Sequence, residues 1–313
     1  MGQQPPARML IRSYADMTLR YGQVERAAFD GDPLDAFIFK TLFSANCRHL
    51  PYASAESRLL ALTGPPAAAA MAERRALLRP VSIHAVSQSL NLPYETVRAR
   101  TRAMMERGQV ERVRGGLLAV AALQAEGPLA EAMLATHAII LDSFRALKAL
   151  GFDVSAHGLP AQVAEPPPPG LVVRIVADMS NRYAELLSPT FGGILPLTIW
   201  GGAMRANVRD LMADPETAWR YACQDEPPPD HLRKPISVRA LSAELGLPFE
   251  TTRRHVAAMI DRGWLAAVPG QGVITPVSAL GADSLGHTNL QLPGLYARMF
   301  CDLARAGFDL GAL

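Results

Sequence analysis

The sequence is poor in the residues that build metal and redox sites. Among 313 residues there are three cysteines and seven histidines. Cys47, Cys223 and Cys301 lie far apart, with no CxxC pair and no zinc-finger spacing to histidine. We therefore expect buried free thiols rather than a disulfide framework, and neither a metal site nor a bound cofactor.

Long apolar segments are also missing. No run of about twenty uncharged apolar residues occurs, which is the length needed to cross a bilayer as a helix. The first residues, Met1–Arg12, lack the basic start and apolar run of a signal peptide. These absences predict a cytoplasmic protein without a membrane partner.

Neither the net charge nor any catalytic motif indicates a function. The 31 basic and 29 acidic side chains leave a net charge of +2, so any nucleic-acid surface depends on where the arginines lie. The chain has no nucleophile elbow, P-loop, dinucleotide-binding glycine motif or zinc-protease motif. We expect no enzymatic activity.

What the sequence does contain is a long internal repeat. The segment 79–120, RPVSIHAVSQSLNLPYETVRARTRAMMERGQVERVRGGLLAV, is answered from Arg233 by RKPISVRALSAELGLPFETTRRHVAAMIDRGWLAAVPGQGVITP. The two copies align without a gap from proline 80 or 235 to glycine 108 or 263. Earlier segments recur as well: Ala15–Tyr21 returns as Ala177–Tyr183. A repeat of this length indicates a tandem duplication.

Each copy predicts two short helices followed by a β-hairpin. Ser82 and Ser237 have the side chain and position of helix N-caps. Asn91 and Gly246 then suit a left-handed residue at the helix end, and a proline opens the second helix two residues later. The predicted elements are helices 84–90 and 239–245, second helices closing at glycines 108 and 263, and strands 110–113, 117–120, 264–268 and 273–275.

These segments resemble the winged helix-turn-helix of bacterial transcriptional regulators of the MarR, GntR and IclR kind. The resemblance rests on SQSLNLPYETVRARTRAMMERGQVERV and SAELGLPFETTRRHVAAMIDRGWLAAV. It implies that the second helix of each copy is a recognition helix and the hairpin a wing. Many such regulators dimerise through their terminal helices and hold two recognition helices about one DNA turn apart.

The predicted fold is mainly α with small β-wings, built as two tandem winged helix-turn-helix halves with flanking helices. The first half is 1–154, with its winged helix at about 80–120. The second half is 171–313, with its winged helix at about 235–276. Because one chain carries both halves, the resemblance allows a pseudo-dimer. The proline-rich linker 155–170 is expected to stay extended and outside both cores.

The outward faces of the predicted recognition helices and of the first wing supply the candidate DNA-binding residues. Arg98 and Arg253 are the principal candidates, since a guanidinium can pair with guanine or clamp a phosphate. Arg107 and Arg262, at the helix ends, are expected to cap rather than read DNA. The second wing carries no charge, so we expect the first half to bind more strongly. The full set is Tyr94, Glu95, Arg98, Arg102, Arg112, Arg114, Phe249, Glu250, Arg253 and Arg254.

The sequence thus predicts a sequence-specific DNA-binding transcriptional regulator that reads two half-sites in double-stranded DNA. Two alternatives stay open. The winged helices can instead form a protein-interaction or architectural module with weak or no DNA binding. A small-molecule effector can also occupy an apolar cavity between the long helices of the two halves. A homodimer is compatible with either. Each of these arginines can also be an ordinary solvated side chain on an exposed helix face. Trp200, Trp219 and Trp264 are expected in a core or interface.

Overall fold

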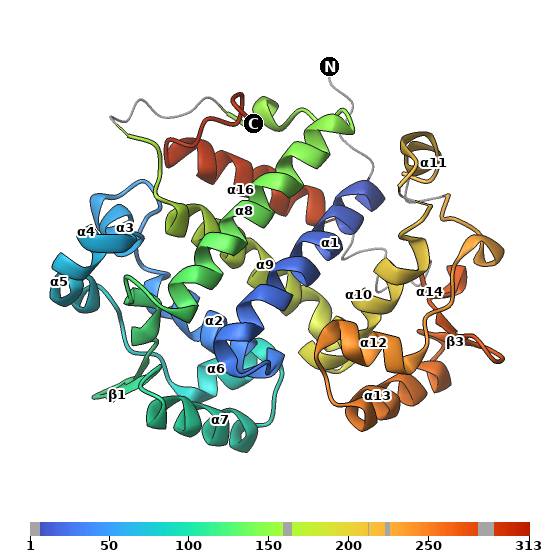
Figure 1. Ribbon diagram of the computed structural model, residues 1–313, viewed down its shortest axis with the longest axis horizontal. Coiled ribbons are helices and arrows are strands. Elements are labelled where there is room, and N and C mark those ends of the chain that lie inside the picture. Colours follow the sequence, from blue (N-terminus) through green and yellow to red (C-terminus); the bar gives the residue numbers. More distant parts are fainter. Residues whose placement is uncertain (1–6, 159–164, 212, 223–225, 281–290) are drawn as a thin grey trace.

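A computed structural model describes residues 7–158, 165–211, 213–222, 226–280 and 291–313. Within these ranges the protein is mainly helical, with two small antiparallel sheets of two strands each (Figure 1). The predicted class, mainly α with small β-hairpins, is confirmed.

The first half begins with two long helices and ends with a third. Between them lie three one-turn or two-turn helices, a pair of short helices and a hairpin. The elements are α1 (Ala7–Glu25), η1 (Arg26–Phe29), α2 (Pro33–Cys47), α3 (Ala55–Leu60), α4 (Gly64–Ala69), α5 (Met71–Ala76), α6 (Ile83–Leu90), α7 (Tyr94–Glu106), β1 (Glu111–Val113), β2 (Gly116–Leu118), η2 (Val120–Leu123), α8 (Pro128–Ala149) and η3 (Val154–His157).

The second half repeats this order with a shorter variable segment. Its elements are α9 (Pro169–Phe191), α10 (Ile194–Val208), α11 (Pro215–Arg220), η4 (Asp230–Leu232), α12 (Val238–Leu245), α13 (Phe249–Asp261), β3 (Ala266–Val268), β4 (Gly272–Ile274), α14 (Val277–Leu280) and α16 (Leu292–Arg305). The strands are shorter than predicted, and α1 ends at Glu25, with a 3₁₀ turn continuing to Phe29.

The local signals for the two-helix pairs are confirmed. The Ser82 and Ser237 hydroxyls each accept a hydrogen bond of 3.2 Å from the backbone N–H three residues later. Asn91 and Gly246 adopt left-handed conformations, with φ of 49° and 67°. Such a residue ends one helix and turns the chain toward the next. The same two features, a serine N-cap and a left-handed residue at the helix end, therefore set the turn in both halves.

Each hairpin gains a third partner from the residue just before the two-helix pair. Val81 pairs with Leu117, and Ile236 pairs with Val273. A Cβ at Gly116 would lie 2.4 Å from the Val81 carbonyl oxygen, and one at Gly272 would lie 2.2 Å from that of Ile236. Only glycine allows this approach, because any side chain would collide with the backbone.

The two halves share one core. Its buried residues come from α1 and α8 of the first half and from α9, α10 and α16 of the second. Tyr14 and Tyr183, from the two repeated helices, stack edge to face with ring centroids 4.7 Å apart. The halves are therefore not independently packed units.

The prediction that the proline-rich run stays outside both cores is wrong at its C-terminal end. Pro167 is buried, and α9 already begins at Pro169. Arg58 donates to the carbonyl oxygens of Glu165 and Pro166 at 2.7 and 2.8 Å. Arg58 thus holds this run against the first half, and sequence periodicity does not predict such a contact. Residues 159–164 lie outside the described residues.

Equivalent residues of the repeat reach across to the opposite half. Arg12 of α1 donates to the Tyr221 carbonyl oxygen at 2.7 Å. Its counterpart, Arg174 of α9, donates to the carbonyl oxygens of Cys47 and Leu50 at 2.7 and 2.8 Å. Each half's first helix therefore holds the segment that follows the other half's second helix.

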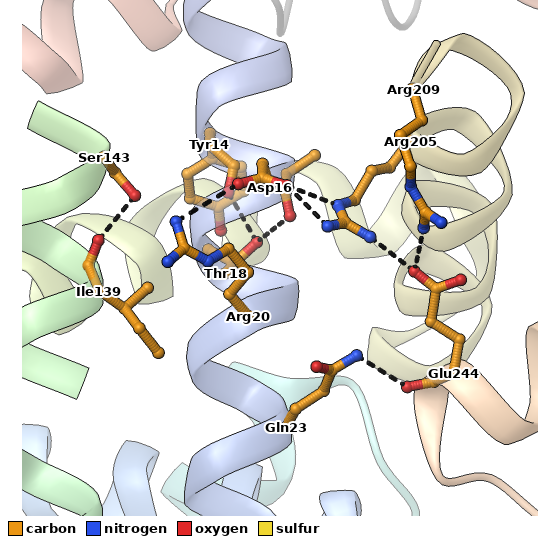
Figure 2. Close-up of polar contacts among 11 residues, drawn as sticks. Tyr14, Asp16, Thr18, Arg20, Gln23, Ile139, Ser143, Arg205, Arg209 and Glu244 are labelled. Carbon is orange, nitrogen blue, oxygen red and sulfur yellow. Dashed lines mark hydrogen bonds and ion pairs between the residues drawn. The ribbon is translucent and has the colours of Figure 1, made fainter. Parts of the chain in front are cut away.

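A second reciprocal pair lies one turn further along the same helices. Asp16 binds Arg205 of α10 at 2.7 Å, while its counterpart Asp178 accepts a hydrogen bond from Ser44 of α2. Figure 2 shows Arg205 lying between Asp16 and Glu244, with Arg209 reaching the same glutamate at 2.6 Å. These contacts fix α1 against the second half's two-helix pair.

Candidate nucleic-acid interface

The helices α7 and α13 lie along one edge of the molecule. Figure 1 shows both along the lower edge of the view, with β1 and β3 toward opposite outer sides. Each helix is the second of its two-helix pair and follows the left-handed turn described above. The repeat therefore presents two equivalent surfaces on the same edge.

The structure brings all of the predicted site residues to the surface. The ten side chains predicted for this site are all exposed. The opposite faces of the two helices are buried, with Val97 and Met104 in α7 and Val256 and Met259 in α13. Helical periodicity correctly separated the two faces.

The arginines on these faces form either exposed ion pairs with glutamates or, among the described residues, no ion pair. Arg98 contacts Glu95 at 2.6 Å, Arg253 contacts Glu250 at 2.9 Å, and Arg102 contacts Glu106 at 3.3 Å. Glu95 raises the pKa of Arg98 by hydrogen bonding and charge. Exposed pairs of this kind contribute little to stability, so a phosphate can replace the glutamate. Arg112, Arg114 and Arg254 make no ion pair within the described part of the chain.

Two arginines that face the protein instead anchor α7. Arg100 contacts Asp35 at 2.6 Å and Asp32 at 2.7 Å, and Arg107 contacts Asp35 at 2.7 Å. Burial alone would raise the pKa of Asp32, but the Arg100 hydrogen bond holds that pKa below its ordinary value. Arg107 is the C-cap residue of α7, as predicted, and its side chain also reaches back to the start of α2.

This anchor was missed because Arg100 and Asp35 are distant in sequence. The available signal was Asp32-Pro33, which starts α2: the Asp32 carboxylate accepts from the N–H groups of Leu34 and Asp35. The second half has no equivalent of the carboxylate pair, since the matching positions are glycine and proline.

An aromatic cluster anchors α13 instead. Phe191 packs against Trp200 and Trp264, with ring centroids 4.9 and 5.1 Å apart. The Trp200 indole N–H donates to the Trp264 carbonyl oxygen at 3.2 Å. Trp200 is buried in the core and Trp264 is partly buried against it, as predicted, whereas Trp219 is exposed. The helices α7 and α13 are thus fixed by different chemistry.

One buried asparagine in each half fixes the hairpin. Asn46 donates to the Arg79 and Leu117 carbonyl oxygens at 2.6 and 2.9 Å and accepts from the Ala119 N–H at 3.0 Å. Asn207 makes the same three bonds in the second half, at 2.7, 3.1 and 2.8 Å. Each hairpin therefore has a fixed position relative to α2 or α10.

Metal and thiol chemistry find no support in the part of the chain described. Within it no group of three or more histidine, cysteine, aspartate or glutamate residues could hold a metal ion. Cys47 is a buried free thiol, and burial raises its pKa to about 12. Cys223 lies outside the described residues. Among the described helices, none combines the length and apolar character that a membrane crossing requires.

Comparison with known proteins finds no relative: no family model, curated protein or solved structure matches this chain.

Proposed function

We propose that this protein is a DNA-binding transcriptional regulator. It carries two winged helix-turn-helix units in one chain, arranged as a pseudo-dimer that reads two half-sites. One observation carries the proposal: the repeat sets two exposed arginine-bearing helix faces, α7 and α13, on the same edge of one rigidly packed molecule. A duplex has its major groove open to one side once per turn, and two linked readers on one edge match that geometry.

The reciprocal contacts support this arrangement. A two-site reader needs a fixed distance between its recognition helices, because half-site spacing is set by the helical repeat of DNA. Arg12, Asp16 and their counterparts Arg174 and Asp178 tie each first helix to the opposite half. The shared core joins the helices that flank the two readers.

The exposed side chains have distinct proposed roles. Arg98 and Arg253 reach base edges or inner phosphates, and Arg102 and Arg254 follow the phosphate backbone. Arg112 and Arg114, on and beside β1, contact phosphates or the minor groove.

The second half is proposed to bind more weakly. Its wing, residues 266–274, contains no charged side chain, whereas the first wing presents two arginines without ion-pair partners in the described chain. Each phosphate contact contributes to the salt dependence of binding, so the first half-site should have the steeper slope.

A protein-interaction module is the alternative, and one observation favours it. Tyr94 and Phe249 are 44% and 41% exposed at the start of the two helices. However, Trp264 packs into the core cluster rather than extending this apolar surface, and the Arg239 guanidinium lies 5.8 Å from the Phe249 ring. A basic group over the ring suits a charged backbone better than an apolar partner.

The test is selection of bound sequences from a random duplex pool at moderate salt. The wild type is compared with two double variants, Arg98→Ala with Arg102→Ala and Arg253→Ala with Arg254→Ala. We expect a two-part site that loses one half with each double variant. Each lost arginine contact should cost about 1–3 kcal/mol.

A matched control uses Arg145→Ala with Arg305→Ala. These arginines are also exposed and paired three residues away, but they lie on α8 and α16. Their loss should leave the selected site unchanged. No enrichment by the wild type would overturn the regulator proposal and favour the protein-interaction module.

A further inference from the structure

We propose that the outer side of the first half binds the phosphate backbone of duplex DNA beyond the first half-site. The flank surface, as we name it, consists of Arg75, Arg79, Arg112 and Arg114, and all four side chains are exposed. Basic side chains on a surface bind DNA of any sequence, because they neutralise phosphates and release counterions. This role rests on the proposed DNA-binding function and extends it from the two half-sites to the adjoining DNA.

The four arginines lie in or beside one hairpin. Arg75, at the end of α5, donates to both carboxylate oxygens of Glu111 in β1, at 2.5 and 3.0 Å. Pro80, the neighbour of Arg79, packs against the hairpin turn, since a Cβ on Gly115 would lie 3.7 Å from the Pro80 Cβ. Figure 1 shows α5 and β1 on the same outer side of the molecule, with α7 along the lower edge. The flank surface therefore extends from the edge that carries α7 onto the outer side of the first half.

The second half provides an internal comparison for Arg79. Lys234 occupies the matching position, and the backbone N–H of each residue donates to the carbonyl oxygen of the buried asparagine of its half, at 3.0 and 2.9 Å. Asp210 pairs with Lys234, whereas the residue that matches Asp210 in the first half is His49. The backbone around the two cations is thus alike, and the partner differs.

The first half places a neutral imidazole where the second half has a carboxylate. Burial, together with the charges of Arg79 and Arg174, lowers the pKa of His49 below its ordinary value of about 6.5. His49 is therefore mostly uncharged at pH 7 and does not neutralise a guanidinium. Arg79 is exposed and makes no ion pair within the described part of the chain. Its charge is available to a phosphate.

The remaining positions show the same contrast between the halves. Counted from the aligned prolines and hairpins, the second-half residues that match the four arginines are Asp230, Lys234, Ala267 and Pro269. Both hairpins nevertheless consist of two three-residue antiparallel strands, and both bond to a buried asparagine in the same way. The fold therefore does not require the four arginines, and a binding role explains them better than a structural one.

The direction of a bound duplex leads to the same surface. A duplex that lies along α7 and α13 leaves the molecule past β1 on one side and past β3 on the other (Figure 1). On the β1 side, the phosphates that follow the half-site meet Arg112 and Arg114 first. A bend toward the protein then brings the next phosphates to Arg79 and Arg75, and such contacts offset the energy of bending DNA. We expect a longer footprint on the β1 side only.

The test measures binding of selected duplexes by fluorescence anisotropy over a series of salt concentrations. One duplex carries one helical turn of flanking DNA (~10 bp) on each side of the two-part site. Two others lack the flank next to the first or the second half-site. Each phosphate contact contributes about 0.9 to the salt slope, the steepness with which the logarithm of affinity falls with the logarithm of salt concentration. Loss of the first flank should weaken binding about fivefold or more, and loss of the second flank less than about twofold.

Reciprocal substitutions exchange the partner of the cation between the halves. His49→Asp gives Arg79 the carboxylate that Lys234 has, so the salt slope should fall by about 0.9 and the effect of the first flank should shrink. Asp210→His releases Lys234, so the salt slope should rise by about 0.9. Arg79→Ala should match His49→Asp, and combining these two substitutions should add nothing further.

Two controls accompany these variants. His49→Asn changes the imidazole without adding a charge, and Arg145→Ala removes an exposed cation of α8 that is paired with Asp142. Both should leave the salt slope and the flank effect unchanged. The side chains of Lys234 and Asp210 are 72% and 58% exposed, so Asp210→His keeps the comparison available if His49→Asp does not fold.

Equal losses from the two truncated duplexes, or unchanged salt slopes in both His49→Asp and Asp210→His, would overturn the flank surface. If no duplex is selected, the regulator proposal fails, and the same variants are measured on a duplex of random sequence at low salt. A lower salt slope for His49→Asp on that duplex keeps the flank surface as a general DNA-binding site. No binding of that duplex overturns the flank surface as well.

Discussion

At the scale of single residues, the backbone around the two buried asparagines strictly limits which side chain can stand there. Asn46 and Asn207 are 0% and 1% exposed, and each satisfies two carbonyl oxygens and one N–H of the adjoining backbone. Only an amide offers both donors and an acceptor in this space. The identity of these residues is thus set by the backbone around them rather than by packing alone.

We predict that Asn46→Ala and Asn207→Ala each lower the free energy of unfolding by about 3 kcal/mol, because buried backbone groups lose their partners. Urea unfolding measures this. Asn181→Ala is the control, since its buried Nδ2 has no partner among the described residues, and it should cost less than about 1 kcal/mol. Equal losses in Asn46→Ala and Asn181→Ala would contradict the role given to the three bonds.

At the scale of elements, the helices α7 and α13 are held differently. The helix α7 is fixed by Arg100 and Arg107 on Asp35, and α13 by the Phe191, Trp200 and Trp264 cluster. An ion-pair anchor depends on pH and salt, whereas an aromatic anchor does not. The first reader should therefore be the more easily perturbed of the two.

We predict that Asp35→Ala lowers the free energy of unfolding by about 2 kcal/mol, because it leaves two arginines without their shared, largely buried carboxylate. It should also weaken binding to the first half-site and leave the second unaffected. For stability, Glu250→Ala is the control: it breaks an exposed pair and should cost less than about 0.5 kcal/mol. Unfolding by urea and binding to the selected duplex measure the two effects. A uniform loss at both half-sites would count against a separate anchor for α7.

At the scale of the whole molecule, the two repeated halves are joined by a shared core. The core joins α1, α8, α9, α10 and α16, and the arginine contacts cross in both directions. The first helix of each half also packs against helices of the other half. Stability should accordingly belong to the whole chain rather than to each half.

We predict a single transition in differential scanning calorimetry, with the calorimetric and van't Hoff enthalpies in agreement. Arg174→Met should lower the midpoint of that one transition, because two carbonyl oxygens and Asp178 lose a buried partner. Arg145→Ala, at an exposed pair, should leave the midpoint unchanged. Two resolved transitions in the wild type would show that the halves unfold independently.

The sequence predicted the structure correctly where the signal came from residues close together in the chain. The N-caps at Ser82 and Ser237, the left-handed turns at Asn91 and Gly246, and the buried and exposed faces of α7 and α13 follow from neighbouring residues and helical periodicity. The sequence placed Arg107 correctly at the helix end but did not predict the contact of its side chain with Asp35, which is 72 residues away. It failed for the end of the proline run, which Arg58 fastens to the first half.

The sequence by itself therefore determined the repeat, the mainly helical class and the surface residues of the candidate interface, because caps, turns and periodicity act within a few residues. Only the tertiary structure decided that the halves share a core, that α7 and α13 lie on one edge, and that Arg75 lies against the first hairpin. Several contacts behind these features join residues more than a hundred positions apart, such as Tyr14 and Tyr183. Such contacts leave no periodic trace, since each requires only that two distant side chains match in shape, charge or hydrogen bonding.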